Sequence, residues 1–412
     1  MVFQMLLARC LKLFSHNLIV KEQAMNKVRL GIIGIGGMGG AHAKEVLDGK
    51  VPRCELAAIC DIDTSLFAKY PGIKAYDDSA KMIRSGDVDA VLIATPHYDH
   101  TTIGIDALQN GIHTLVEKPI SVHKADAEKL IAAHDDPKIK FAAMFNQRTD
   151  PYYIKIHDLI KKGEIGKIQR SNWIITNWFR TEAYYRSGGW RATWAGEGGG
   201  VLVNQCPHNL DLYQWLCGMP SSVIAIGGLG KFHDIEVEDD VSALFEYPDG
   251  ATGAFFTTTG EAPGTNRLEI AGDRGKLVFE IARGVRKLEF IRNEVPAGEY
   301  LKTSSNRFGV PSIWNVEVPI SGGTGEQHLG IKKNFVAAIL DNVPLIAPAE
   351  DGIRSVEIAN AMQYSLMTKK RVDLPMDGAA YEAYLKQLIA KSTFKKVTDK
   401  NTDSNVGGSF NI

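Results

Sequence analysis

The chain has 412 residues, of which 44% are hydrophobic, and this length favours two domains with buried cores over one. Its 47 basic and 48 acidic residues give a formal net charge of -1, so no strong field attracts nucleic acid or an anionic membrane, and a small neutral partner is expected. The five cysteines are scattered and odd in number, which argues against a zinc site or a disulfide framework and is typical of reduced thiols in the cytoplasm.

Residues 1–25 precede the first regular pattern in the sequence. Their apolar patches are interrupted by Arg9, Lys12 and His16, so no apolar run reaches membrane-spanning length. Neither a charged start nor a small-residue cleavage site indicates a signal peptide. Because Met25 stands directly before the first strand pattern, we predict a disordered arm or an extension from an alternative start. A weak amphipathic anchor is the alternative.

Residues 26–147 alternate between strand and helix patterns. Strand patterns cover 27–36, 54–63, 90–96, 112–119 and 140–148, and helical patterns cover 40–49, 100–111 and 125–134. Gly49 and Gly111 end two of these helices, and Pro119 ends a strand. The alternation is the signature of a parallel sheet built from βαβ units, and it predicts a dinucleotide-binding Rossmann domain over residues 26–147.

The pattern changes after residue 148. Alternating apolar positions flank the turn at 248–250, and a similar pattern covers 266–280, which indicates hairpins of an antiparallel sheet. Two helical patterns follow at 326–342 and 350–370. We therefore predict a second domain, of class α/β, over residues 148–390, which binds substrate and forms oligomers, and a polar tail over 391–412.

The glycine cluster "GIGGMGG" lies between the first strand pattern and the first helical pattern. Gly34, Gly36 and Gly39 fit the G-x-G-x-x-G fingerprint, in which the glycines allow a tight turn, close approach to a pyrophosphate and close helix packing. Gly37 and Met38 lie inside the fingerprint, at the helix start where free N–H groups favour anions. Glycines that only form a turn are the structural alternative.

Asp61 ends the second strand pattern, roughly 20 residues after the glycines, as the fingerprint requires. Its carboxylate can accept both ribose hydroxyls of NAD and would repel the 2′-phosphate of NADP. The sequence therefore predicts NAD in preference to NADP. An Asp61 that only caps the following helix is the alternative.

Lys118, in the motif "VEKP", ends a predicted strand at the edge where doubly wound sheets bind ligands. A lysine beside a nicotinamide can donate a hydrogen bond to a substrate hydroxyl, and burial can lower its pKa toward the range of proton transfer. Taken alone, Glu117 and Lys118 could equally be a surface ion pair.

Six motifs in this order, "GIIGIGGMG", "CDID", "ATPHYDH", "VEKPI", "NQR" and "GEGGGVLVNQCPHNLDLYQWLCG", closely resemble the Gfo/Idh/MocA family of nicotinamide-dependent sugar and cyclitol oxidoreductases. The resemblance covers roughly residues 26–375. It implies an α/β fold with an N-terminal Rossmann domain and a C-terminal α/β domain that carries a large open, mostly antiparallel sheet. It also implies that this sheet forms a subunit interface, as in a homodimer or homotetramer.

The resemblance makes Lys118 and His208 the catalytic pair. The family places an aspartate four residues before the histidine, where this chain has Asn204. Asparagine can still bind a sugar hydroxyl, but it holds no charge and accepts no proton, so either His208 or Lys118 can be the base. If residues 204–216 are helical, Asn204 and His208 share a face, and Asp211 either orients His208 or points to solvent.

The remaining candidate positions surround the expected nicotinamide and substrate. By resemblance, Thr95, Pro96, His97, His100, Glu117, Gln147, Trp190 and Arg191 contact the cofactor. Trp178, Arg180 and Tyr185 are of the residue types that pack on sugar rings and bind hydroxyls, although ordinary packing between domains is the alternative. No metal is expected, because no carboxylate or cysteine cluster accompanies His97 and His100.

These features together predict an NAD-dependent dehydrogenase that acts on a ring hydroxyl of a sugar, glycoside or inositol. Two alternatives stay open. The first is a sugar–sugar oxidoreductase or a glycosidase that keeps NAD tightly bound. The second is a sugar-sensing regulator that binds NAD without catalysis, against which the retained Lys118 and His208 argue.

Overall fold

The computed structural model describes residues 26–398. The predicted extension at 1–25 lies outside the described residues, and so does the part of the predicted tail from residue 399 onward.

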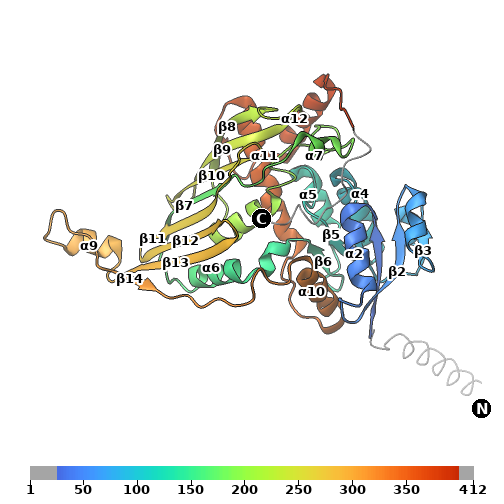
Figure 1. Ribbon diagram of the computed structural model, residues 1–412, viewed down its shortest axis with the longest axis horizontal. Helices are drawn as coiled ribbons and strands as arrows, with labels where there is room; N and C mark the ends of the chain where they lie inside the picture. The colour runs from blue at the N-terminus through green and yellow to red at the C-terminus, as the bar shows by residue number, and fades with distance from the viewer. Residues whose placement is uncertain (1–25, 399–412) are drawn as a thin grey trace, which may run out of the picture.

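The first sheet has six strands, and every neighbouring pair is parallel (Figure 1). Its order is β3-β2-β1-β4-β5-β6, with β1 Val28–Ile33, β2 Cys54–Cys60, β3 Lys74–Tyr76, β4 Ala90–Ile93, β5 His113–Val116 and β6 Phe141–Ala143. This is the strand order of the Rossmann fold, which confirms the predicted fold of the first domain. The order reverses between β1 and β4, so a crevice for a ligand is expected outside the carboxyl ends of these two strands.

Helices cover both faces of this sheet, and for this reason all four residues of β4 are buried. The helices that follow the strands are α2 Gly37–Leu47, α3 Ser79–Ile83, α4 His97–Gln109 and α5 Lys124–Ala132. The single turn η2 at Asn146–Thr149 leads out of the first sheet toward the second domain.

The second sheet has nine strands, and only the pair β7–β10 is parallel. The order is β14-β13-β12-β11-β7-β10-β9-β8-β15. The strands are β7 Ile168–Ile175, β8 Ser222–Leu229, β9 Glu238–Glu246, β10 Thr252–Thr258, β11 Asn266–Gly272, β12 Gly275–Ala282, β13 Val285–Asn293, β14 Ile313–Val316 and β15 Val372–Asp373. The predicted hairpins correspond to β9–β10 and β11–β12, so the mostly antiparallel sheet is confirmed.

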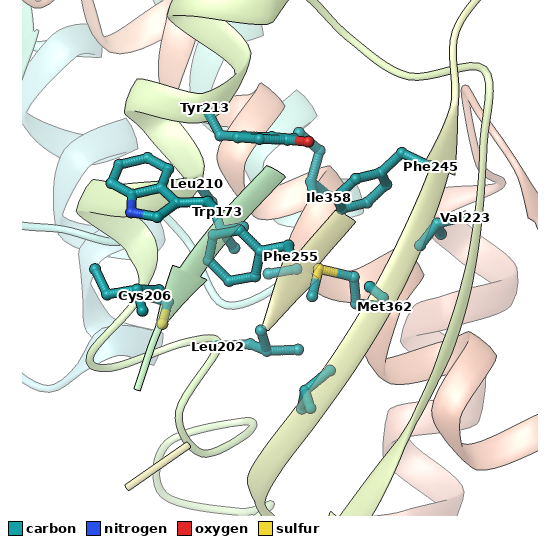
Figure 2. Packing of buried hydrophobic residues seen from close by; sticks show 14 of the residues in the cluster. Trp173, Leu202, Cys206, Leu210, Tyr213, Val223, Phe245, Phe255, Ile358 and Met362 are labelled. Atoms are coloured by element: carbon teal, nitrogen blue, oxygen red, sulfur yellow. The ribbon is translucent and has the colours of Figure 1, made fainter. Parts of the chain in front are cut away.

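The helices of this second part are α6 Pro151–Lys161, α7 Glu182–Arg186, α8 Pro207–Cys217, α9 Ala297–Thr303, α10 Gln327–Asp341, α11 Gly352–Thr368 and α12 Gly378–Lys391. Helix α11 packs against β8 on one side and against α5 of the first domain on the other (Figure 1). Aromatic side chains fill the layer between the sheet and its helices, where Trp173 and Phe255 meet Tyr213 of α8 (Figure 2). None of the helices in residues 26–398 is both long and apolar enough to cross a membrane.

Part of the chain returns to the first domain after the second sheet. Ile331, Phe335 and Val336 of α10 are buried in the core of the parallel sheet, together with Val356 of α11. The sequence prediction assigned all of 148–390 to the second domain, so it did not anticipate this return. The reason is that an apolar helix face does not reveal which of two cores it covers.

Candidate functional site

The glycine fingerprint forms the turn between β1 and α2. Gly34 has a φ of +83°, and a Cβ there would lie 2.8 Å from the carbonyl of Ala94. A Cβ on Gly39 would lie 1.7 Å from the carbonyl oxygen of Gly34. A Cβ on Gly36, in contrast, would meet nothing within 4 Å. Packing therefore requires two of the glycines, whereas Gly36 borders open space that a phosphate can approach closely.

Asp61 follows β2 directly, and its side chain stabilises this turn through hydrogen bonds. One of its carboxylate oxygens accepts a hydrogen bond from the main-chain N–H of Ile35 at 2.8 Å, and the other accepts one from Asp63 N–H at 2.9 Å. A carboxylate has about four acceptor positions, so two remain for ribose hydroxyls.

Residues 95–100 follow β4 at the same edge of the sheet. The Thr95 hydroxyl and Nδ1 of His97 are buried and have no hydrogen-bond partner among the described residues. The His97 ring meets the edge of Trp190 at a centroid distance of 5.4 Å, and Arg191 lies over the Trp190 ring at 4.6 Å. The structure thus brings these predicted cofactor residues together, and Pro96 caps the start of α4 beside them.

Two predicted cofactor residues have their polar atoms engaged by the protein. Both ring nitrogens of His100 lie within hydrogen-bond distance of main-chain carbonyls, those of Pro119 at 2.8 Å and Thr95 at 2.9 Å. The Glu117 carboxylate lies 2.8 Å from Nε2 of His42 and also accepts the N–H of Lys118 at 3.1 Å. We therefore find that His100 and Glu117 hold the adjacent main chain in place.

Lys118 is buried at the end of β5. Its Nζ donates a hydrogen bond to the main-chain carbonyl of Asn204 at 2.5 Å. Burial lowers the pKa of the Lys118 ammonium, while the charges of Glu117 and Glu197 oppose this shift. A lowered pKa makes a buried lysine a better candidate for proton transfer than an exposed one.

His208 lies in the first turn of α8, directly after Pro207, which is tolerated there because a helix start needs no N–H at this position. Burial, together with the charge of Lys118, lowers the pKa of His208 well below 6.5, so the ring is neutral at pH 7. Its buried Nδ1 has no hydrogen-bond partner in residues 26–398. Asn204 lies in the turn before α8 rather than on a shared helix face, because the helix begins at Pro207.

Asp211 has neither of the two roles considered from the sequence. It is 1% exposed, and its carboxylate accepts two hydrogen bonds from the Arg148 guanidinium, at 2.6 and 2.8 Å. Arg148 also pairs with Asp351 at 2.9 Å. Asp211 therefore joins α8 to the end of the Rossmann sheet and neither orients His208 nor faces solvent.

A cavity of about 180 Å³ opens between the two sheets and contains the predicted catalytic residues. Lys118, Asn204 and His208 line it together with Gln147, Trp178 and Arg180. Tyr185 does not line it, because its ring is buried and its hydroxyl donates to Thr259 at 2.8 Å.

Several residues that line the cavity escaped the sequence analysis. Arg286 of β13 forms an ion pair with Asp150, and the rest are Tyr153, Ile175, Gln205, Asn209, Asn266, Ile281, Thr324, Gln327 and His328. Asp150 before Pro151 is a recognisable helix cap, but nothing local distinguishes Arg286 from other strand residues.

The carboxyl edge of the first sheet offers groups that fit a dinucleotide. The glycine turn, the braced Asp61 carboxylate and the unpartnered Thr95 and His97 atoms fit a dinucleotide that runs along the carboxyl ends of β1 and β4. Within residues 26–398, the geometric group of potential metal ligands is His123, Asp126 and Glu382, and lysines already pair with both carboxylates.

Two family models match the chain. The model described as the oxidoreductase family, NAD-binding Rossmann fold, matches residues 28–143, and the GFO/IDH/MocA C-terminal domain matches residues 153–278. Inositol 2-dehydrogenase of Rubrobacter xylanophilus is 27% identical over 256 residues, which span 60% of this chain and 70% of that protein. Levoglucosan dehydrogenase of Pseudarthrobacter phenanthrenivorans is 25% identical over 402 residues, spanning 86% of this chain and 100% of that protein.

Solved structures show the same fold. The WlbA dehydrogenase from Bordetella pertussis, in complex with NADH and UDP-GlcNAcA, aligns with a TM-score of 0.71 at 24% identity over 85% of this chain and 100% of that chain. Levoglucosan dehydrogenase in complex with NADH and levoglucosan aligns with a TM-score of 0.69 at 23% identity over the same shares of the two chains.

Proposed function

The chain belongs to the Gfo/Idh/MocA family of oxidoreductases, and from this premise we propose that it is an NAD-dependent dehydrogenase that oxidises a ring hydroxyl of a sugar, glycoside or inositol. The observation that carries the proposal is the convergence of Lys118 and His208 in one cavity beside the carboxyl edge of the Rossmann sheet. Relatives named for inositol and levoglucosan support a polyol or anhydrosugar substrate.

The proposed chemistry divides between the two catalytic residues. Bound NAD supplies the acceptor for the hydride that leaves the carbon bearing the hydroxyl. His208 removes the hydroxyl proton, because its low pKa keeps the ring neutral and able to accept one. Lys118 donates a hydrogen bond to the same oxygen, and Trp178 offers an apolar ring face for the sugar.

The cofactor preference follows from Asp61. Its carboxylate accepts two main-chain hydrogen bonds at the end of β2, and we propose that its remaining acceptor positions bind the ribose hydroxyls of NAD. The same negative charge would repel the 2′-phosphate of NADP. The roles expected of the other residues remain part of this proposal, except those of Tyr185, which does not line the cavity, and of His100 and Glu117, which hold the adjacent main chain.

We further propose that the protein forms a homodimer or homotetramer through the outer face of the nine-stranded sheet. Ile174, Ile224, Ile226 and Leu244 are exposed on β7, β8 and β9, where a second copy would cover them. The free cysteines Cys54, Cys60, Cys206 and Cys217 support a reducing compartment such as the cytoplasm.

The test is a panel of inositols, aldoses, glycosides and levoglucosan, screened for reduction of NAD and repeated with NADP. The proposal expects NADH formation with at least one polyol and a lower rate with NADP. A protein that binds NADH but turns over none of these compounds would support the sensing regulator. Oxidation that is coupled to reduction of a second sugar, without NADH release, would support the enzyme that retains its cofactor.

A further inference from the structure

A buried carboxylate lies directly beside Asn204 and was not among the candidate residues. Glu197 is 2% exposed, and one of its oxygens accepts a hydrogen bond from Nδ2 of Asn204. The other oxygen accepts the main-chain N–H of Ala192 at 2.6 Å. Burial raises the pKa of the Glu197 carboxyl group, and the Arg191 charge, the hydrogen bonds from Ala192 and Asn204 and the Lys118 charge oppose this rise and favour its ionised form.

Hydrogen bonds leave the Asn204 amide a single orientation. Because Nδ2 donates to Glu197, Oδ1 faces the other way and accepts from the Tyr184 hydroxyl at 3.2 Å. The Tyr184 oxygen in turn accepts from Arg191 at 2.9 Å. A chain of hydrogen bonds therefore runs from the Arg191 cation through Tyr184 and Asn204 to the Glu197 anion.

The same asparagine is linked to the proposed catalytic lysine. Lys118 donates to the main-chain carbonyl of Asn204 at 2.5 Å. The two carboxylates whose charges stabilise the Lys118 ammonium are Glu117 and Glu197. Glu117 is paired with His42, whereas Glu197 lies on the Asn204 side of Lys118, where it accepts the hydrogen bond from Nδ2 of Asn204.

The family pattern has an aspartate at the position of Asn204. We propose that Glu197 is a positioning residue that supplies this missing negative charge one side chain farther from the substrate, where it holds the Asn204 amide and stabilises the Lys118 ammonium. The inference rests on the proposed dehydrogenase function. A purely structural Glu197, which only closes the loop onto Ala192, is the competing explanation.

Other charged and titratable side chains face Glu197 or Lys118, and a test of the proposal must leave them unchanged. They are Glu117, His97, Arg180, Tyr184, Tyr185, Arg191, Cys206, His208 and Lys396. None of them is changed in the variants E197Q and E197Q/N204D.

E238Q is a matched control, because Glu238 is also a buried carboxylate and holds the same loop through Gly200 N–H, without touching Asn204.

Two readouts are measured on the full chain. The first is the pH dependence of Lys118 carbamylation in cyanate, a reaction in which only the neutral amine attacks the carbon of isocyanic acid, followed by mass spectrometry of the peptide. The second is the pH profile of kcat with the best polyol of the panel. The carbamylation readout requires no turnover, so it tests the link between Glu197 and Lys118 even if the proposed dehydrogenase function fails.

Loss of the negative charge makes the Lys118 ammonium less stable, so the carbamylation midpoint of E197Q is expected to fall by about one pH unit or more. E197Q/N204D, which restores a carboxylate at the neighbouring position, is expected to return the midpoint and to recover kcat to within roughly tenfold of wild type. E238Q is expected to leave the midpoint unchanged. An unshifted midpoint in E197Q, or a double variant no better than E197Q, overturns the proposal. If E197Q does not fold, E197Q/N204D alone is the test. A carbamylation midpoint and a turnover like those of the wild type then support the proposal, and loss of both overturns it.

Discussion

At the scale of single residues, the charge states of Lys118 and His208 determine what the cavity can do. Both side chains are buried, and burial lowers both pKa values, which favours a neutral imidazole and a lysine closer to deprotonation. The sequence named both residues through their motifs. It did not identify Glu197, because the loop that brings this carboxylate to Asn204 follows from tertiary packing and has no periodic pattern.

The base role of His208 predicts a specific pH dependence. Activity requires the neutral ring, and burial holds the pKa of the His208 ring well below 6.5, so the acid limb of the wild-type kcat profile should lie below pH 6.5. H208N cannot accept the proton and should lose roughly 100-fold or more in kcat. Affinity for NADH, measured by fluorescence titration, should remain unchanged. A fall of kcat that sets in at or above pH 6.5, or full activity of H208N, would show that His208 is not the base.

At the scale of elements, strand ends and glycine turns were the most predictable features. Continuous apolar runs predicted β1, β4 and β5, and glycines predicted the turn before α2, because buried parallel strands and tight turns depend on local sequence. The start of α8 was less predictable. Its pattern extends back to Asn204, but the regular helix begins only at Pro207, so the expected shared face with His208 was wrong.

The glycine turn offers a matched pair of substitutions. G39A places a methyl group 1.7 Å from a main-chain oxygen, so both thermal stability and NADH affinity should decrease. G36A meets nothing within 4 Å, so thermal stability should be retained while NADH affinity falls by roughly tenfold or more, because the methyl group enters the space proposed for the phosphates. Calorimetric melting and titration with NADH measure both quantities. Unchanged NADH affinity in G36A would place the dinucleotide away from this turn.

At the scale of the whole molecule, the site depends on contacts that join the two sheets. The proposed catalytic lysine comes from the first domain and the proposed catalytic histidine from the second, and α10 returns to pack on the first core. Sequence patterns predicted both sheets. They could not predict the Arg148–Asp211 ion pair or the contribution of Arg286 to the cavity, because such long-range pairs leave no periodic signal.

The buried ion pair between Arg148 and Asp211 predicts that a substitution of Asp211 strongly destabilises the protein. D211N removes the charge of one partner of a pair in which both side chains are at most 2% exposed, and within residues 26–398 it leaves Asp351 as the carboxylate paired with Arg148. The free energy of unfolding should fall by about 3–5 kcal/mol, measured by urea denaturation. D77N, which removes an exposed pair with Lys81, is the control and should cause no measurable change. Equal effects of the two variants would show that the Arg148 pair does not hold the domains together.

The most direct test of the proposed function is the rate of NADH formation from the best polyol of the panel by K118A, measured beside its affinity for NADH. K118A is expected to bind NADH as the wild type does but to lose roughly 100-fold or more in kcat, while the surface variant K81A keeps wild-type activity. Retention of wild-type turnover by K118A would contradict the assignment of this cavity as the catalytic site.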